Sequence, residues 1–156
     1  MIYTSYFANS RNFPKGAIPI AICRGVPSWY NGLVYQTVAP TQRILQEWHE
    51  DNDERAYKVR FAHDVLRNVE PVRVLNELQL MIPYETREKM DCPVWDSKDV
   101  HIVLLCYEVA EDFCHRHLVA DWLNRFFGTE KVKELGANRG PISDFPENYY
   151  PLHMRF

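Results

Sequence analysis

The stretch HIVLLCYEVAEDFCHRHLVADWLNRFFGTEKVKEL, residues 101–135, decides the fold of this chain. It opens with an apolar run at 101–107, which is typical of a strand that is buried on both faces. An amphipathic pattern over 113–127 predicts a helix that stops at Gly128, and KVKEL at 131–135 is typical of a short strand. Strand, helix and strand in this order form a βαβ unit, which predicts the α/β class with a mainly parallel sheet.

The chain before this unit contains two more predicted strands. IYTSY at 2–6 alternates and is rich in β-forming residues, and AIPIAIC at 17–23 is typical of a buried strand, although Pro19 weakens it or places it at an edge. Only about ten residues join the two, which is short for a helical crossover. The connection is therefore an extended loop, or the two strands are antiparallel. Helices are predicted at 41–49, at 54–69 and from Pro71 onward.

Length and composition indicate one globular domain. The chain has 156 residues, of which 46% are hydrophobic and 13% aromatic, enough to bury a core without metals or disulfides. We predict a single Rossmann-like α/β domain over residues 1–136, with a mainly parallel sheet of about four to five strands flanked by helices. An aromatic, proline-rich tail over 137–156 is expected to pack on it.

Charge and targeting signals restrict the partners. A formal net charge of −3 argues against a strongly basic surface for bulk nucleic-acid binding, although a local basic patch stays open. No stretch reaches the length of a membrane helix, and the first ten residues lack the build of a signal peptide. We therefore expect no membrane association and a cytoplasmic location, where the four cysteines are reduced thiols and form no disulfide.

Reactive residues gather where the apolar strand ends and the next helix begins. Cys106 and Glu108 lie at the strand end, and Cys114, His115 and Arg116 open the helix. Ligands of open α/β sheets settle at the carboxyl ends of strands. Free backbone N–H groups and the dipole of a helix start stabilise an anion there. The sequence therefore predicts an anion-binding pocket at this junction.

Glu108, Cys114 and Arg116 are predicted catalytic residues of this junction, and Cys106 and His115 are predicted to bind the ligand. With Asp112 as the N-cap, Cys114 falls in the first turn, where a lowered pKa would make its thiol a nucleophile. Arg116 offers a planar fork for phosphate or carboxylate, and Glu108 is a general base or orients that arginine. Simple packing is the alternative for both cysteines, above all for Cys106 in the apolar strand.

No metal and no cofactor are predicted. The chain has no CxxC pair, so a zinc ribbon or a thioredoxin-type motif is not indicated. Cys114, His115 and His117 carry zinc-ligating atoms, but adjacent positions on one helix point in different directions. We therefore assign no metal ligand.

Arginines and aromatic residues follow the first two predicted strands. Arg11 comes after the first strand, and Arg24, Tyr30 and Tyr35 come after the second. If both strands run parallel to 101–107, these residues lie at the same sheet edge as the junction. Arginine interleaved with aromatic rings suits a phosphate-bearing ligand with a stackable base. Anchoring of the loops by their aromatic rings is the alternative.

The segment LLCYEVAEDFCHRHLVADWL, residues 104–123, resembles the signature of the bacterial and phage family known as domain of unknown function 488. In that family a strand ends in Cys-x-Glu and a Cys-His-Arg triplet opens a helix, which correspond here to Cys106, Glu108 and residues 114–116. IYTSYFANSRNFP is similar to the family's opening strand and loop, and AICRGVPSWYNG to its second strand, which ends in Arg24. The resemblance spans residues 1–136.

Two features depart from the family pattern. Many members have a full helix between the first two strands, where this chain has a loop. The usual Asp-Val-Arg at the second strand is Ile-Cys-Arg here, residues 22–24, so any role of that aspartate is lost or moved. The resemblance implies a Rossmann-like fold and a pocket near the Cys-His-Arg triplet.

Two functions are consistent with these residues. The first is a small enzyme that acts on a nucleotide or nucleic acid, in which Arg24 and Arg116 bind the anionic part, Glu108 does acid–base work, and Cys114 is the nucleophile or a pocket wall. The second is a non-catalytic module that senses a nucleotide or binds a protein, for example a phage factor that counters host defence.

Overall fold

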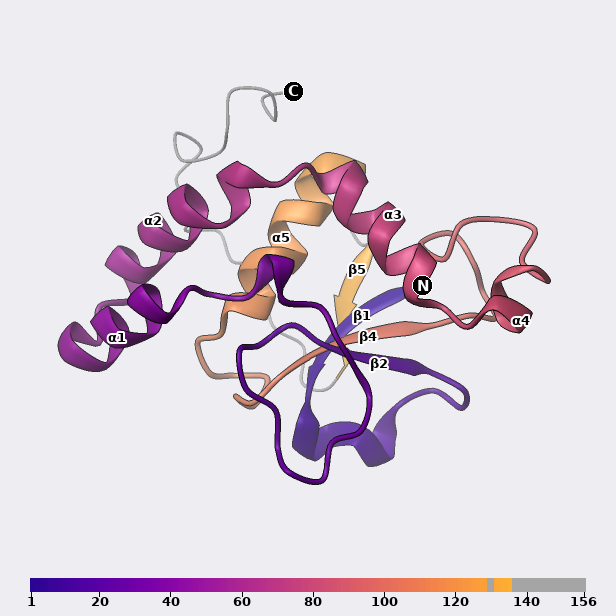
Figure 1. Cartoon of the computed structure of the whole chain (residues 1–156), viewed down its shortest axis with the longest axis horizontal. Helices are drawn as coiled ribbons and strands as arrows, with labels where there is room; N and C mark the ends of the chain where they lie inside the picture. The colour runs from indigo at the N-terminus through magenta and orange to yellow at the C-terminus, as the bar shows by residue number, and fades with distance from the viewer. Residues whose placement is uncertain (129–130, 136–156) are drawn as a thin grey trace.

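The computed structural model describes residues 1–128 and 131–135. It confirms the α/β class: a single five-stranded sheet, parallel at every pairing, is flanked by helices (Figure 1). The strands are β1 (Ile2–Tyr6), β2 (Ile18–Ala21), β3 (Leu33–Val34), β4 (Ile102–Cys106) and β5 (Val132–Glu134), in the spatial order β3-β2-β4-β1-β5. The tail predicted over 137–156 lies outside the described residues.

The first two strands are parallel, with β4 between them. Residues 7–17 carry the chain from the end of β1 to the start of β2, and they contain the 3-10 helix η1 (Phe7–Asn12). The antiparallel alternative is therefore wrong, and the connection is wound more tightly than an extended loop. This crossing leaves β4 in the middle of the sheet, where every one of its residues is buried.

Pro19 is compatible with an inner strand because of where β3 pairs. β2 has neighbours on both sides, but β3 pairs only with Ile20 and Ala21. Pro19 lies just before that pairing, so its missing N–H removes no ladder hydrogen bond on the β3 side. The strand β3 was not predicted, since its segment was assigned to a loop.

The predicted helices form close to their expected places. Thr41 caps α1, and Asp53 caps α2, each through a side chain that accepts from the backbone N–H three residues on. Pro71 occupies the first turn of α3, as predicted. The helices are α1 (Gln42–Asp51), α2 (Glu54–Asp64), α3 (Pro71–Met81), α4 (Tyr84–Arg87) and α5 (His115–Phe127), with further 3-10 turns η2 (Gln36–Val38) and η3 (Leu66–Asn68).

The start of α5 differs from the prediction. The N-cap is Cys114 and not Asp112, so the helix begins at His115 and Cys114 lies outside the first turn. Cys114 has extended backbone angles, and its thiol does not cap the helix. Gly128 ends the helix as predicted, with a φ of 101°.

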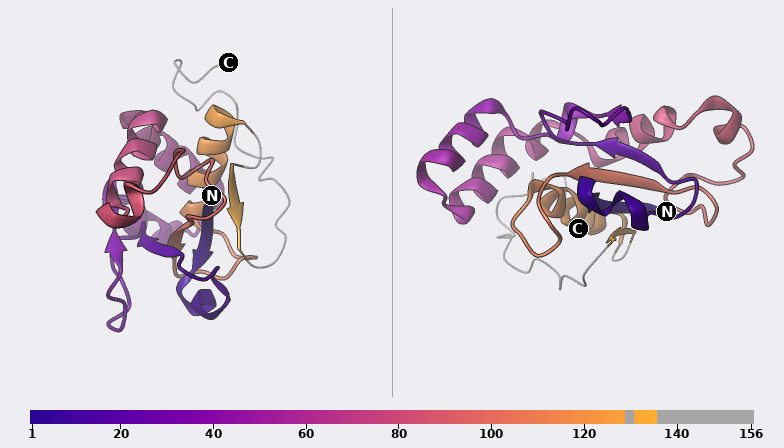
Figure 2. Two further views of the ribbon diagram at one scale, coloured as in Figure 1. Left: turned by 90° about the vertical axis from the view of Figure 1, so that its right-hand side faces the viewer. Right: turned by 90° about the horizontal axis from the view of Figure 1, so that it is seen from below.

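The two faces of the sheet are covered differently (Figure 2). On one face, Ile20, Ile102 and Leu104 pack in the main core with α2, α3 and α5. On the other face, Val103 and Leu105 pack in a smaller core beneath η1 and the loop that follows β2. None of the described helices has the length and apolar character needed to cross a membrane.

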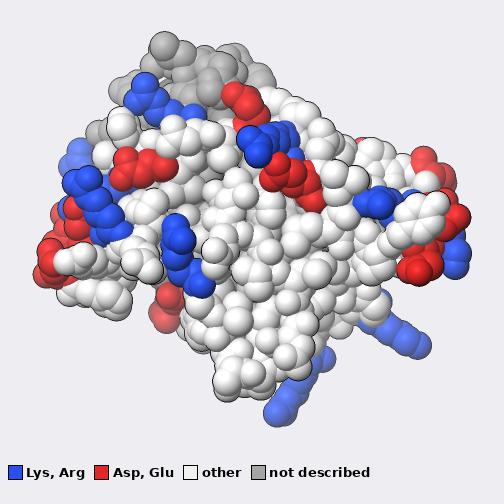
Figure 3. Space-filling view, in the orientation of Figure 1, with Lys and Arg blue, Asp and Glu red and all other residues white. Residues whose placement is uncertain are grey.

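Charged groups do not form a large basic surface on the face seen in Figure 1. Lysine and arginine side chains are interspersed with acidic ones around a broad uncharged area (Figure 3). This distribution agrees with the net charge of −3 and does not favour bulk electrostatic binding of nucleic acid to that face.

Candidate functional site

A cavity of about 160 Å³ lies where β2 and β4 end and α5 begins. The two strands are parallel neighbours, so their carboxyl ends meet at the same edge of the sheet. Polar and sulfur-bearing side chains line one part of the cavity: Cys23, Cys106, Glu108, Cys114 and His115. Aromatic side chains line another part: Trp48, Tyr57, Tyr107 and Phe113. Arg24, which is exposed, belongs to the lining as well.

His115 is buried at the floor of this cavity, and its ring is held in one orientation. Its Nε2 lies 2.7 Å from the backbone carbonyl oxygen of Ile22. A carbonyl oxygen only accepts hydrogen bonds, so Nε2 carries the proton, and in the neutral ring Nδ1 carries the lone pair. Nδ1 faces two sulfur atoms, 3.7 Å from Cys106 Sγ and 3.9 Å from Cys114 Sγ.

Burial decides the state of the Cys114 thiol. The side chain is buried, which raises its pKa well above the usual value, and the adjacent Cys106 thiol raises it further. The lowered pKa that we predicted for this thiol is therefore wrong, because Cys114 is desolvated and lies outside the first helical turn. Its role as a nucleophile stays a prediction.

Glu108 brings a carboxylate to the same cluster. Cys106 Sγ donates to its Oε2 over 3.2 Å. Burial raises the pKa of the Glu108 carboxyl, but hydrogen bonds from the Cys114 thiol, the backbone and the Cys106 thiol outweigh it, so the pKa is lowered overall. Glu108 is therefore a carboxylate at neutral pH, in contact with two thiols.

Arg116 is directed away from the cavity. Its side chain is 0% exposed, and its Nη2 and Nε donate to the two carboxylate oxygens of Glu134 in β5 over 3.0 and 3.3 Å. Nη1 and Nη2 also donate to the backbone carbonyls of Glu108 and Val109 over 2.6 and 3.2 Å. These contacts anchor the loop after β4 to β5. The predicted binding of an anion by Arg116 stays a prediction, and the guanidinium does not line the cavity.

The other predicted ligand-binding residues are dispersed. Tyr35 is buried, and its hydroxyl donates to Glu77 in α3. The Tyr30 hydroxyl lies 2.7 Å from the carbonyl oxygen of Leu33 and 3.1 Å from that of Pro19, and its single proton is shared between these two acceptors. Both therefore act as loop anchors in this structure. Arg11 is exposed on η1 and lines neither this cavity nor the second one described below.

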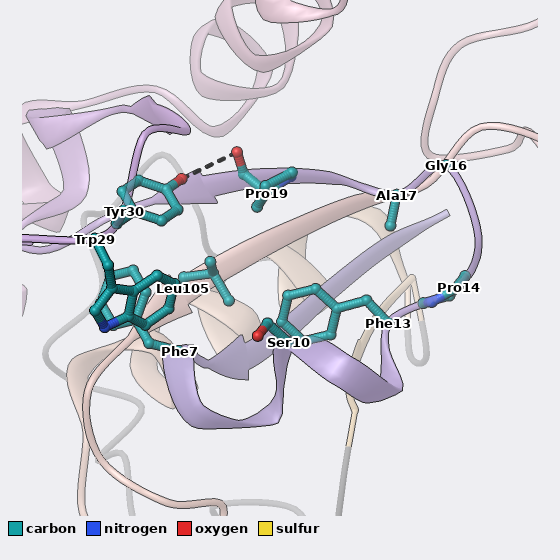
Figure 4. Close-up of a pocket in the computed structure, with 10 residues that line it drawn as sticks. All are labelled: Phe7, Ser10, Phe13, Pro14, Gly16, Ala17, Pro19, Trp29, Tyr30 and Leu105. Atoms are coloured by element: carbon teal, nitrogen blue, oxygen red, sulfur yellow. Dashed lines mark hydrogen bonds between the residues drawn. The ribbon is translucent and has the colours of Figure 1, made fainter. Parts of the chain in front are cut away.

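Tyr30 belongs to a second cavity of about 300 Å³ beneath the η1 side of the sheet (Figure 4). Phe7 and Phe13 come from the β1–β2 connection, and Trp29 lies beside Tyr30. Among the residues that the structure describes, no charged side chain lines this cavity. Its lining is mainly apolar and lacks the carboxylate, imidazole and thiol groups of the smaller cavity, so we place the candidate site in the smaller cavity.

The structure thus brings together Arg24, Cys106, Glu108, Cys114 and His115 among the predicted residues. Sequence reasoning missed other contributors to the cavity or its supports: Cys23, Trp48, Tyr57, Tyr107, Phe113 and Glu134. Tyr57 and Trp48 belong to apolar helix stripes, which predict a core position and give no sign of a pocket.

Comparison with known proteins identifies the family. A family model described as the active DUF488-N3 subclade matches residues 19–126, which include the cavity's cysteines and the Cys-His-Arg triplet. The chain therefore belongs to the family of domain of unknown function 488, as the resemblance of its Cys-x-Glu and Cys-His-Arg motifs implied. No curated protein and no solved structure matches the chain.

Proposed function

We propose that this chain is a small enzyme that binds a nucleotide, free or within a nucleic acid, in the cavity at the ends of β2 and β4. The observation that carries the proposal is the contact of the Glu108 carboxylate with the Cys106 thiol, which in turn contacts the His115 imidazole, beside an aromatic wall and an exposed arginine. In this proposal Glu108 accepts or donates a proton at the reacting atom.

The cavity accepts one part of a nucleotide. Its volume of about 160 Å³ is below the roughly 300–1,000 Å³ of pockets that enclose a whole drug-sized ligand. The rings of Trp48 and Phe113 lie 5.2 Å apart, and Tyr57 meets Phe113 edge to face at 5.0 Å. Such a wall favours a planar group, for which a nucleobase is the natural candidate.

Arg24 is suited to the anionic part. Its Nε donates to the carbonyl of Pro40 over 2.8 Å, which fixes the side chain at the rim. Within the described part of the chain, no hydrogen bond or ion pair to its two Nη groups is seen, so they are available to a phosphate. The thiols of the site must be reduced, so we also propose a reducing compartment such as the cytoplasm.

A protein-binding module is the second candidate function. The edge strand β3 exposes Leu33 and Val34, and the side chain of Trp29 in the preceding loop is 59% exposed. An exposed edge strand with apolar side chains is a site at which a partner can add a strand. This observation supports the binding of a partner protein at β3, a function that would not use the residues of the cavity.

Binding and turnover of nucleotides test the proposal. We would screen nucleotides and short oligonucleotides by thermal shift, then measure affinity by calorimetry and product formation by chromatography. Arg24→Ala should weaken binding by about 10- to 100-fold, because a charged hydrogen bond is lost. Arg11→Ala, an exposed arginine outside both cavities, is the matched control and should leave affinity unchanged.

Glu108→Gln separates catalysis from binding. This variant keeps the shape of the side chain but does not accept a proton, so it should bind nucleotide and lose turnover. If no nucleotide or oligonucleotide shifts the melting temperature, or if Arg24→Ala and Arg11→Ala bind alike, the proposal fails. Binding without any turnover by the wild type would support a sensing module in its place.

A further inference from the structure

We propose that Cys106, Cys114 and His115 form a site for a divalent cation of the zinc type, with one coordination position open toward the cavity. This site is independent of the identity of the ligand that the cavity takes. It also revises our sequence-based assignment, which contained no metal ligand.

The three ligand atoms already have nearly the separation that zinc requires. The Sγ atoms of the two cysteines and one ring nitrogen of His115 all lie within 4.8 Å of one another. The Nδ1–Sγ distances are 3.7 and 3.9 Å. Zinc bonds of about 2.3 Å to sulfur and 2.0–2.1 Å to nitrogen, at tetrahedral angles, place such atoms about 3.6 Å apart. An ion would shorten the two nitrogen–sulfur distances by only a few tenths of an ångström, and it would hold the two sulfur atoms, now within 4.8 Å, about 3.8 Å apart.

The ring of His115 is oriented as in metal sites. Zinc-bound histidines direct their other N–H to a carbonyl or carboxylate, which fixes the tautomer and the direction of the free lone pair. Here the carbonyl of Ile22 accepts from Nε2 over 2.7 Å. The remaining nitrogen, Nδ1, therefore presents its lone pair to the two sulfur atoms.

The backbone explains why adjacent residues serve one ion. We excluded zinc from the sequence because neighbouring positions within a helix point in different directions. Cys114 is the N-cap and has extended angles, φ −153° and ψ 142°, so helix geometry does not govern its side chain. His117, the third residue considered then, instead lies beside Glu134, with Nδ1 3.8 Å from its Oε2. Cys106, from the end of β4, takes its place.

Three protein ligands leave one position for water or substrate, the pattern of catalytic rather than structural zinc sites. Both cysteines and His115 line the cavity, so the fourth position faces the space where a ligand would lie. The Glu108 carboxylate is 3.2 Å from Cys106 Sγ and is placed to accept a proton from a water molecule in that position. The Cys23 thiol hydrogen-bonds with Cys106 and donates to the carbonyl of Gly25 over 3.0 Å, but it is not one of the three residues whose ligand atoms all lie within 4.8 Å of one another.

Binding should release protons. Zinc binds thiolates, whereas Cys106 and Cys114 are both free thiols and Cys106 donates its proton to Glu108, so two thiol protons must leave when the ion enters. Two thiolates neutralise the charge of the ion, and the neutral imidazole adds none. A buried site of zero net charge avoids the cost of an uncompensated charge in the protein interior.

The test uses the purified full chain without an affinity tag. Zinc is added, excess ion is removed, and metal content is measured by elemental analysis, with affinity from competition against a chromophoric chelator. We expect about one zinc per chain. Replacement by cobalt should give the absorption of tetrahedral cobalt together with a thiolate-to-cobalt charge-transfer band.

Variants identify the ligands. Cys106→Ser, Cys114→Ser and His115→Gln should each weaken zinc binding by more than the roughly 10- to 100-fold that loss of a supporting contact costs. Cys92→Ser is the matched control, since Cys92 is a partly exposed free thiol outside the cluster, and it should bind zinc like the wild type. Circular dichroism of each variant checks that it is folded, and the two cysteine variants keep the test valid if His115→Gln does not fold.

Several outcomes would overturn the proposal. They are a wild type without stoichiometric zinc, a cobalt complex without the thiolate band, and equal losses in Cys92→Ser and Cys114→Ser. Loss of zinc binding in Cys23→Ser would overturn the open position, because a fourth protein ligand would close the site. These readouts need no nucleotide, so failure of zinc binding and failure of the proposed enzyme are observed separately.

Discussion

Replacing Arg116 by alanine is expected to destabilise the protein strongly. The guanidinium is 0% exposed, and removing it leaves the Glu134 carboxylate, which is 9% exposed, without its charged partner. Breaking one side of a buried ion pair costs about 3–5 kcal/mol. The helix dipole alone predicts the opposite, a slight gain, since a cation in the first turn is unfavourable by about 0.3–1 kcal/mol. The buried pair is the larger effect, so we expect a net loss of about 3 kcal/mol or more.

Urea unfolding, followed by tryptophan fluorescence, measures this loss, and the melting temperature should fall by roughly 10 °C. Arg43→Ala is the matched control: its ion pair with Glu47 is exposed, with the Arg43 side chain 79% accessible, and its loss should cost less than about 0.5 kcal/mol. Arg116→Met combined with Glu134→Leu should recover part of the stability, because no unpaired charge stays buried. A loss for Arg116→Ala no larger than that of the control would refute the reasoning.

Three further changes test other contacts. Tyr35→Phe should cost about 1 kcal/mol at pH 7, because the Tyr35 hydroxyl donates to the partly exposed Glu77 carboxylate and lowers its pKa. A carboxylate whose pKa is lower in the folded protein stabilises the fold at pH values above its unfolded pKa. In urea unfolding, the difference in stability between wild type and variant should therefore shrink as the pH falls below about 4. Gly128→Ala should lower the melting temperature and cost about 1–3 kcal/mol, because φ 101° and ψ 155° lie in a region open almost only to glycine; an unchanged melting temperature would contradict this. Thr41→Ala should cost about 1 kcal/mol in chemical denaturation, since the hydroxyl caps α1 at Ile44, whereas Thr41→Ser should restore most of it.

The fold was predictable because its strongest signals are local. The apolar run that became β4 and the amphipathic stripe that became α5 follow from side-chain periodicity, and their order determines the class. The strand β3 has two exposed residues and no alternation, so nothing in its own sequence marks it. It is a strand because its backbone pairs with β2, and a pairing with another segment is not encoded in its own sequence.

In the candidate site, too, the features that local sequence signals determine were predicted, and those that depend on distant residues were not. The rule that ligands lie at strand ends placed Cys106, Glu108 and Arg24 correctly at one edge of the sheet, because it needs only the direction of the strands. The directions of Tyr35 and Arg116 depend instead on partners far away in sequence, Glu77 and Glu134. Nothing in the sequence around a loop tyrosine or a helix-start arginine indicates such distant partners.

The side chains of the Cys-His-Arg triplet therefore point in different directions, two toward the cavity and one toward β5. Cys114 and His115 face the cavity. Arg116 instead points toward β5 and donates hydrogen bonds to the backbone carbonyls of Glu108 and Val109. Arg116, which follows the two candidate ligands in the sequence, thus holds the backbone of the loop that carries the Glu108 carboxylate. Because Cys106 Sγ lies 3.2 Å from Glu108 Oε2, a displacement of that loop by about one ångström would break this hydrogen bond. Arg116 is on this account a positioning residue, and the sensitivity of the site to its loss follows from geometry, without any contact between its guanidinium and a ligand.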